Sequence, residues 1–184
     1  MIGWIILIVV LAIIAWLIST YNSLVTLKRR VENAWSQIDV QLKRRHDLIP
    51  NLVNSVKGYM KFEQETLEKV MKARASAISS KDINKRMESE NELSGMLSRL
   101  LAIVENYPEL KANENVNKLM EELRKTEDKI AYSRQFYNDI VMKYNTKLSV
   151  FPTNIIANMF SFKKEPYFKA PEEEKGTPNV DLSI

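Results

Sequence analysis

The chain has 184 residues, and 45% of them are hydrophobic, enough for one domain with a sizeable core and additional segments. Cysteine is absent, which excludes disulfides, thiolate nucleophiles, cysteine zinc sites and lipid anchors attached to cysteine. The net charge is +4, and the whole excess lies within the first 60 residues, where seven cations accompany three carboxylates. These cations form no recognisable module with stacking aromatics, so we expect no nucleic-acid partner.

The N-terminal segment IGWIILIVVLAIIAWLI, residues 2–18, is uncharged, and the first charge after it is Lys28. A helix of this length nearly matches the hydrocarbon core of a bilayer, so residues 1–20 are predicted to form a single transmembrane anchor. Trp4 and Trp16 lie near its ends, where indole rings settle at the membrane interface. A cleaved signal peptide is the alternative, but no basic region precedes the segment and no small-residue cleavage site follows it.

Three cations follow the apolar segment directly in sequence: Lys28, Arg29 and Arg30. Because cations beside a span are retained on the cytoplasmic side, the rest of the chain is predicted to face the cytoplasm at a bacterial cytoplasmic membrane. The triplet also predicts contact with anionic headgroups, worth about 1 kcal/mol per cation. The lipid bilayer is therefore the first expected partner.

Residues 21–150 have the pattern of long amphipathic helices. With 4 glycines and 6 prolines in the whole chain, turn signals are scarce, and apolar residues recur at spacings of three and four. The stretch SSKD at 79–82 and Pro108 mark the interruptions, with Ser80 or Asp82 as a helix cap. The sequence predicts an all-α fold, an antiparallel bundle with four helices; a sustained coiled coil is the competing fold.

The C-terminal region breaks this pattern. Pro152 in FPTN is suited to open a short helix, predicted over residues 151–162. Residues 163–184 contain three prolines and a run of charges without a hydrophobic period, which predicts an extended or disordered tail.

Four charged residues fall on inward positions of the helical stripes: Arg45, Glu63, Glu127 and Arg134. The charges of these two cations and two carboxylates sum to zero, and a guanidinium can hold a carboxylate through two hydrogen bonds. We therefore expect a buried or half-buried ionic layer that specifies helix packing, because an unpaired buried ion would cost several kcal/mol. The alternative is that each side chain extends out of a loose seam into water.

Pro50 stands inside the first long helical pattern and cannot donate a backbone hydrogen bond to the carbonyl of His46. A kink or a break must follow, and Asp47 is placed to cap a new helix. We expect a helix break at Asp47–Pro50, which also gives the count of four helices. His46 is expected to be a surface or capping residue.

The sequence offers no machinery for catalysis. A carboxylate-bridged di-iron bundle needs two Glu-x-x-His pairs, and the chain has one histidine. It also lacks a nucleophile turn and a phosphate-binding glycine loop. The chain is therefore expected to be neither an enzyme nor a binder of metals or cofactors.

Three segments resemble the LemA family: residues 21–75, 107–146 and 151–168. The most specific part is the run IDVQLKRRHDLIPNLV within the first segment, and the resemblance covers nearly the whole chain beyond the anchor. The resemblance implies a single-pass, membrane-attached helical bundle without assigned activity, which in some relatives serves bacterial membrane organisation such as magnetosome formation. It brings no catalytic residues. This chain has Phe62 where many relatives have histidine, and some relatives are lipoproteins, which makes an extracytoplasmic bundle the alternative orientation.

Two functions are consistent with these features. The first is a scaffold or adaptor that holds a membrane or peripheral protein at the bilayer. The second is a peripheral lipid-binding or membrane-shaping function. The segment MFSFKK at 159–164 places two phenylalanines beside two lysines, which suits it to press on, sense or shape a membrane surface.

Overall fold

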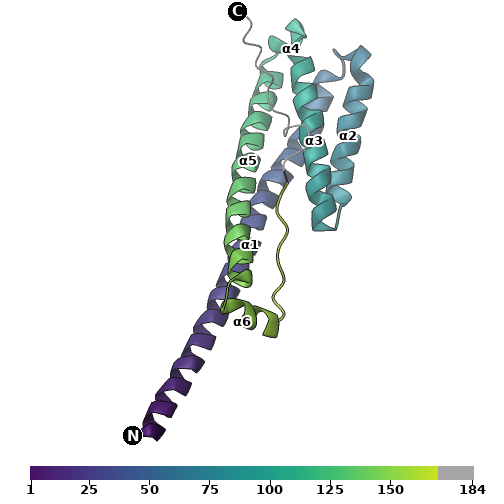
Figure 1. Cartoon of the computed structure of the whole chain (residues 1–184). Coiled ribbons are helices and arrows are strands. Elements are labelled where there is room, and N and C mark those ends of the chain that lie inside the picture. The colour runs from purple at the N-terminus through teal and green to yellow at the C-terminus, as the bar shows by residue number, and fades with distance from the viewer. Residues whose placement is uncertain (170–184) are drawn as a thin grey trace, which may run out of the picture. The chain divides into compact units, whose positions relative to one another are not determined.

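The computed structural model describes residues 1–169; residues 170–184, where most of the predicted tail falls, lie outside the described part. The elements are α1 (Ile2–Val56), the 3₁₀ turn η1 (Lys61–Glu63), α2 (Gln64–Ser79), α3 (Ile83–Val104), α4 (Pro108–Lys111), α5 (Glu114–Ser149) and α6 (Thr153–Met159) (Figure 1). Residues 1–169 contain no strand. The predicted all-α fold, with a long apolar N-terminal helix and further long helices, is confirmed.

The chain falls into two units. The first unit contains Met1–Val40 and Ala131–Tyr167, and the second contains Gln41–Ile130 together with Phe168 and Lys169. Helices α1 and α5 therefore each contribute to both units, and each unit has its own buried residues.

The second unit has a four-helix core. Most of its apolar side chains come from four helical segments, at the spacings of three and four that place residues on one helix face. These segments are residues 41–56 of α1, the whole of α2 and α3, and residues 114–130 of α5; the turn after α1 and the short α4 add one residue each. The buried core residues are Ile49, Leu52, Val56, Met60, Leu67, Val70, Ala73, Ala77, Leu93, Leu97, Leu100, Leu101, Val104, Leu110, Val116, Met120 and Leu123. The second unit is therefore a helical bundle whose core draws on four helical segments.

Local sequence signals set the helix boundaries of this unit. Asp82 caps α3, because its Oδ1 accepts hydrogen bonds of 3.0 Å from the backbone amides of Asn84 and Lys85. Pro108 is the first residue of α4, where its missing amide hydrogen costs nothing, so the region expected to be a loop contains one short helix.

The helix break expected at Asp47–Pro50 does not occur. Helix α1 passes through Pro50 and ends at Val56. The carbonyl of His46, which a proline four residues later leaves without its helical donor, accepts a hydrogen bond of 2.7 Å from Nε of Arg74 in α2. This tertiary contact satisfies the carbonyl, and the chain turns instead after Val56, before η1.

In the first unit, residues 2–40 of α1 and 131–149 of α5 run antiparallel. The ring centroids of Trp35 and Tyr137 are 5.5 Å apart, and nearer the N-terminus Nζ of Lys147 donates to Oγ of Ser23. Burial, together with the charge of Glu165, raises the pKa of Tyr137 to about 12.

A tight turn ends α6, which is shorter than the predicted helix over residues 151–162. Ser161 is left-handed, with a φ of 55°, and its amide donates to the carbonyl of Asn158 at 3.1 Å. The amide of Phe162 donates to the carbonyl of Ala157 at 2.9 Å. These two bonds define a Schellman motif, which fixes where Phe160 and Phe162 leave the helix.

Residues 163–167 are non-helical and lie against α5. The amide of Asn145 holds Glu165 twice: Nδ2 donates to its carbonyl at 2.8 Å, and Oδ1 accepts from its backbone amide at 3.0 Å. The hydroxyl of Tyr137 donates to the carbonyl of Pro166 at 3.0 Å. This part of the predicted tail is therefore held in place by side chains of the first unit.

Candidate functional site

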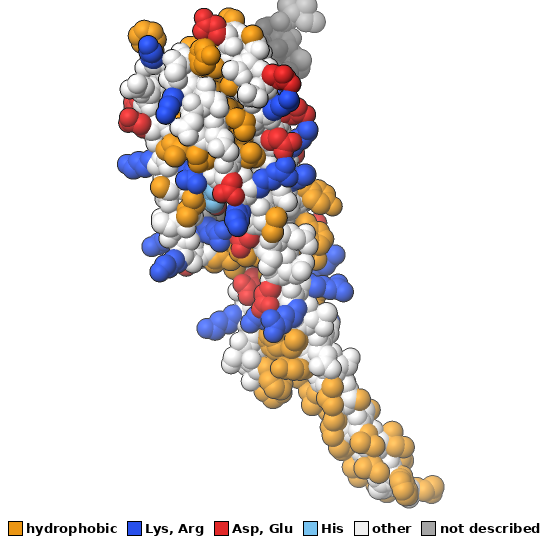
Figure 2. All heavy atoms as spheres, turned by 180° about the vertical axis from the view of Figure 1, so that it is seen from behind, with side chains coloured by type: hydrophobic (Ala, Val, Ile, Leu, Met, Phe, Trp, Pro, Cys, Tyr) orange, Lys and Arg blue, Asp and Glu red, His pale blue; other side chains and the backbone are white. Residues whose placement is uncertain are grey.

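The apolar N-terminal segment is exposed along its whole length. No part of its most apolar 18-residue window is buried, and the helix is long and apolar enough to cross a membrane. On the face that Figure 2 shows, hydrophobic side chains follow this segment and no charged side chain lies among them. Trp4 is 72% exposed and Trp16 39%, near the two ends of the segment. One such helix suggests a single membrane anchor.

The predicted basic triplet lies beyond the apolar segment on α1, with all three side chains exposed. Nη1 of Arg29 forms an ion pair of 2.8 Å with Oε2 of Glu32, three residues along the helix. Lys28 and Arg30 have no ion pair among the residues that the structure describes. Lys28 and Arg30 are thus exposed and available to external anionic groups.

Arg45 is the centre of a buried ionic cluster in the second unit. Its side chain is 0% exposed, and its Nη2 pairs with the carboxylate of Glu90 from α3, which is also 0% exposed. Its Nη1 lies 2.7 Å from Oε1 of Glu127 in α5 and donates to Oγ of Ser94 at 2.6 Å. The guanidinium thus joins three helices, as a planar fork with several donors is able to do.

His46 completes the cluster and is buried rather than on the surface as expected. Its Nε2 lies 3.1 Å from Oε1 and 3.3 Å from Oε2 of Glu90. Burial by itself raises the pKa of the Glu90 carboxyl, but the hydrogen bond from His46 and the charge of Arg45 outweigh burial and leave that pKa below its ordinary value. Glu90 therefore remains an anion inside the bundle.

The structure brings together only two of the four residues predicted to form the ionic layer, Arg45 and Glu127. Glu63 is half-buried in η1 and is not an ion-pair partner of Arg45. Arg134 is half-buried in the part of α5 that belongs to the first unit. The missed member is Glu90, and a signal for it exists, because it lies three residues after Met87 and three before Leu93 on the apolar stripe of α3.

The cluster is suited to packing rather than to chemistry on a substrate. Arg45 and Glu90 are closed to solvent and pair with each other, so a reactant has no access to either group, although Nε of Arg45 has no hydrogen-bond partner among the described residues. Within residues 1–169, no group of three or more histidine, aspartate or glutamate side chains is placed to hold a metal ion. What the arrangement fixes is the register of α1, α3 and α5 in the second unit.

The lowered pKa of Glu90 makes stability depend on pH. A carboxyl whose pKa is lowered by folding stabilises the folded state above its unfolded value of 4.5, and this contribution is lost as the pH falls through the lowered folded value. We therefore expect the free energy of unfolding to decrease below about pH 4.5, and Glu90→Gln to make this decrease shallower. Urea unfolding of the full chain in detergent micelles at several pH values measures it.

Glu121→Gln is the matched control for this pH dependence. The pKa of Glu121 is lowered too, by a hydrogen bond from Lys125, but the pair is exposed and contributes little to stability. The pH profile of this variant should follow that of the unchanged chain. Equal profiles for Glu90→Gln and the unchanged chain would contradict the assignment.

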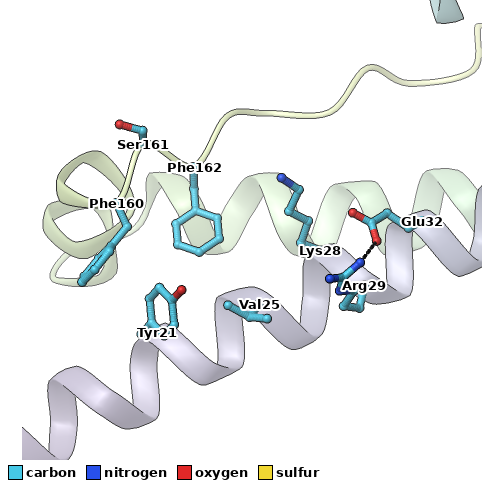
Figure 3. Close-up of a pocket in the computed structure, with 8 residues that line it drawn as sticks. All are labelled: Tyr21, Val25, Lys28, Arg29, Glu32, Phe160, Ser161 and Phe162. Carbon is cyan, nitrogen blue, oxygen red and sulfur yellow. Dashed lines mark hydrogen bonds and ion pairs between the residues drawn. The ribbon is translucent and has the colours of Figure 1, made fainter.

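A pocket opens in the first unit where α6 and the residues after it meet α1 (Figure 3). The ring of Tyr21 lies 4.7 Å from that of Phe160 and 5.9 Å from that of Phe162, measured between centroids. The pocket has a volume of about 290 Å³, and its lining residues are Tyr21, Val25, Lys28, Arg29, Glu32, Phe160, Ser161 and Phe162. It therefore combines an aromatic wall with charged side chains.

Comparison with known proteins identifies the relatives of the chain. The model of the LemA family matches residues 34–182. Protein LemA of Metamycoplasma hominis is 31% identical over 164 residues, which cover 88% of this chain and 74% of that protein. Magnetosome protein MamQ 2 of Paramagnetospirillum magneticum is 27% identical over 186 residues, covering 87% of this chain and 68% of that protein.

A further relative, magnetosome protein MamQ of Magnetospirillum gryphiswaldense, is 25% identical over 183 residues, covering 85% of this chain and 67% of that protein. The matched range contains all of Gln41–Ile130 of the second unit and the whole of α6. The chain is a helical protein whose apolar N-terminal helix suggests a single membrane anchor, and it belongs to the LemA family.

Proposed function

We propose that the protein is a non-enzymatic scaffold or adaptor, anchored in a bacterial cytoplasmic membrane with its bundle in the cytoplasm. The observation that carries the proposal is the exposed, uncharged segment at the start of α1. Leaving so many apolar side chains in water is unfavourable by about 25 cal/mol per Å², and a bilayer removes that cost. Relatives named magnetosome proteins support a role in bacterial membrane organisation.

A protein partner needs a surface, and α5 offers one in the first unit. Tyr132 and Phe136, four residues apart on one helix face, are both exposed. Phe136 also lines an open groove with Ile140 and residues of α1. Exposed aromatic residues of this kind are typical anchors of protein interfaces. We propose this strip as the contact for a membrane or peripheral protein.

Site-specific crosslinking tests the scaffold function. A photoreactive amino acid in place of Phe136, in the full chain in native membranes, should crosslink one protein in near-stoichiometric amount, and Tyr132→Ser should abolish the product. The same amino acid in place of Lys118, exposed in the second unit, is the control. If Phe136 yields no product beyond that of the control, this contact is wrong.

The proposed orientation is testable because the chain has no cysteine. A single Lys118→Cys substitution introduces a unique thiol at an exposed position. A membrane-impermeant maleimide should leave it unlabelled in intact cells and label it after lysis. Labelling in intact cells would place the bundle outside the cytoplasm.

A second candidate function, direct work on the lipid surface, is favoured by α6. Three large apolar side chains on or beside this helix are exposed: Phe151 by 80%, Ile155 by 55% and Met159 by 60%. The ring contacts of Phe160 and Phe162 hold this region beside Tyr21, the residue that follows the predicted span. A short helix with an apolar face and lysines after it is suited to lie in the membrane interface.

The depth of α6 tests this second function. Met159→Cys carrying an environment-sensitive fluorophore, in the full chain in lipid nanodiscs, should emit as in an interfacial environment and be quenched by lipids spin-labelled near the headgroup. Lys118→Cys with the same fluorophore should stay water-exposed. Emission typical of an aqueous environment at both positions would show that α6 does not lie in the membrane interface.

A further inference from the structure

We infer that the pocket between Tyr21 and Phe162 binds the phosphodiester of an anionic phospholipid. The inference rests on the lipid-surface function proposed above and deepens it by naming a ligand and its site. It is carried by the juxtaposition of three aromatic rings and Lys28, which has no ion-pair partner among residues 1–169, just beyond the apolar segment of α1 that is long enough to span a bilayer.

The level of the pocket follows from helix geometry. The residues from Ile2 to Thr20 span about 30 Å, the thickness of the hydrocarbon core. Tyr21 follows at once, so the pocket begins where hydrocarbon gives way to headgroups. Lys28 lies two turns further from the bilayer and lines the same pocket as Phe162, with its side chain extending from α1 (Figure 3). A long lysine side chain at this place is able to reach headgroup phosphates.

The charge of the pocket matches a single negative charge. Arg29 and Glu32 neutralise each other through their ion pair of 2.8 Å. Lys28 has no ion-pair partner among residues 1–169, so the lining carries a net charge of +1. A phosphodiester with an uncharged headgroup carries one negative charge. A choline or ethanolamine headgroup would bring an ammonium beside these cations, so zwitterionic lipids should bind less well.

The shape of the pocket suits the neighbouring part of a lipid. Phe160 and Phe162 approach the ring of Tyr21 at interplanar angles of 54° and 60°, and the three rings form an apolar wall. Such a wall matches the glycerol backbone and the first methylenes of a chain, while Lys28 faces the phosphate. A volume of about 290 Å³ is at the low end for ligand pockets, as suits a headgroup rather than a whole lipid.

Ser161 positions this wall. Its left-handed conformation is the step that turns the chain out of α6 between the two phenylalanines. Ser161→Gly should keep the pocket, because glycine adopts this conformation without strain. Ser161→Val should disturb it, because a β-branched residue strongly disfavours a positive φ. These two variants leave the cations in place, so a difference between them shows that binding depends on the shape of the pocket and not on charge alone.

Native mass spectrometry of the full chain with equimolar phosphatidylglycerol and phosphatidylcholine tests the inference. The chain should retain phosphatidylglycerol preferentially, and Lys28→Gln should lower that preference about fivefold, as expected for one cation near the surface. Ser161→Val should lower the preference too, whereas Ser161→Gly should preserve it. The control is Arg30→Gln, which removes the same charge two residues away but outside the pocket, and should change little.

Each other outcome overturns the inference in a distinct way. Equal losses for Lys28→Gln and Arg30→Gln would mean diffuse attraction to anionic lipid. Displacement of phosphatidylglycerol by millimolar inorganic phosphate would mean a site for free phosphate. If the fluorophore at residue 159 still reports an interfacial depth while headgroup preference is absent, only the pocket fails; if the interfacial depth is also lost, the lipid-surface function fails with it.

Discussion

Arg45→Met should lower the free energy of unfolding by about 3–5 kcal/mol, the largest effect that we expect from a single charged residue. The loss leaves Glu90 as a carboxylate closed to solvent, with only His46 facing its oxygens. The reason is desolvation: a buried anion that has lost its cation has no water to replace it. Urea unfolding of the full chain in detergent micelles measures the change.

A double substitution separates this desolvation from simple loss of packing. Arg45→Met with Glu90→Met removes both buried charges and keeps their volume, so most of the stability should return. Glu127 is 27% exposed and retains access to water without its partner. A double variant no more stable than Arg45→Met would show that the cluster acts by shape alone.

The neighbouring residue provides the control. Arg44 of α1 pairs with Glu122 of α5, but both side chains are substantially exposed. Arg44→Met should therefore change the free energy of unfolding by no more than about 1 kcal/mol. A cost equal to that of Arg45→Met would mean that burial does not set the strength of these pairs.

Pro50→Ala should raise the free energy of unfolding by about 2 kcal/mol. Proline inside a helix costs about 3 kcal/mol, and part of this is returned because proline restricts the unfolded chain. The new backbone amide would lie four residues after His46 and would donate to its carbonyl, now held by Arg74. Thermal unfolding of the full chain followed by circular dichroism measures the increase.

Arg74 is the partner in a thermodynamic cycle with Pro50. Arg74→Leu alone leaves the carbonyl of His46 without a donor and should cost about 1–3 kcal/mol. In the Pro50→Ala background the same change should cost much less, since the restored helical bond occupies that carbonyl. Additive effects would mean that Arg74 does not compensate for the proline.

These contacts also show where sequence reasoning succeeds. The helical period placed Arg45 on the inward face, because only its phase relative to Leu42 and Ile49 was needed. The same count would have found Glu90 in α3. The apolar anchor and its flanking cations also follow from composition and order alone.

The wrong predictions have a common physical origin, because each depends on tertiary contacts or turns that the local sequence pattern does not reveal. Pro50 predicts a break only if the carbonyl of His46 goes unsatisfied, and the donor comes from Arg74, 28 residues away in sequence. Glu63 was assigned to the inward stripe by extending one helix across the turn that follows Val56, which resets the phase. His46 lay within a polar run, and only the position of Glu90 explains its burial.

The two hydrogen bonds between the side chain of Asn145 and the backbone of Glu165 have an evolutionary consequence. Both hydrogen bonds go to main-chain atoms, so the side chain at position 165 is not what is recognised. Mutational drift there should be tolerated for nearly every amino acid except proline, which lacks the amide hydrogen. A segment bound in this way keeps its path while its sequence is free to diverge.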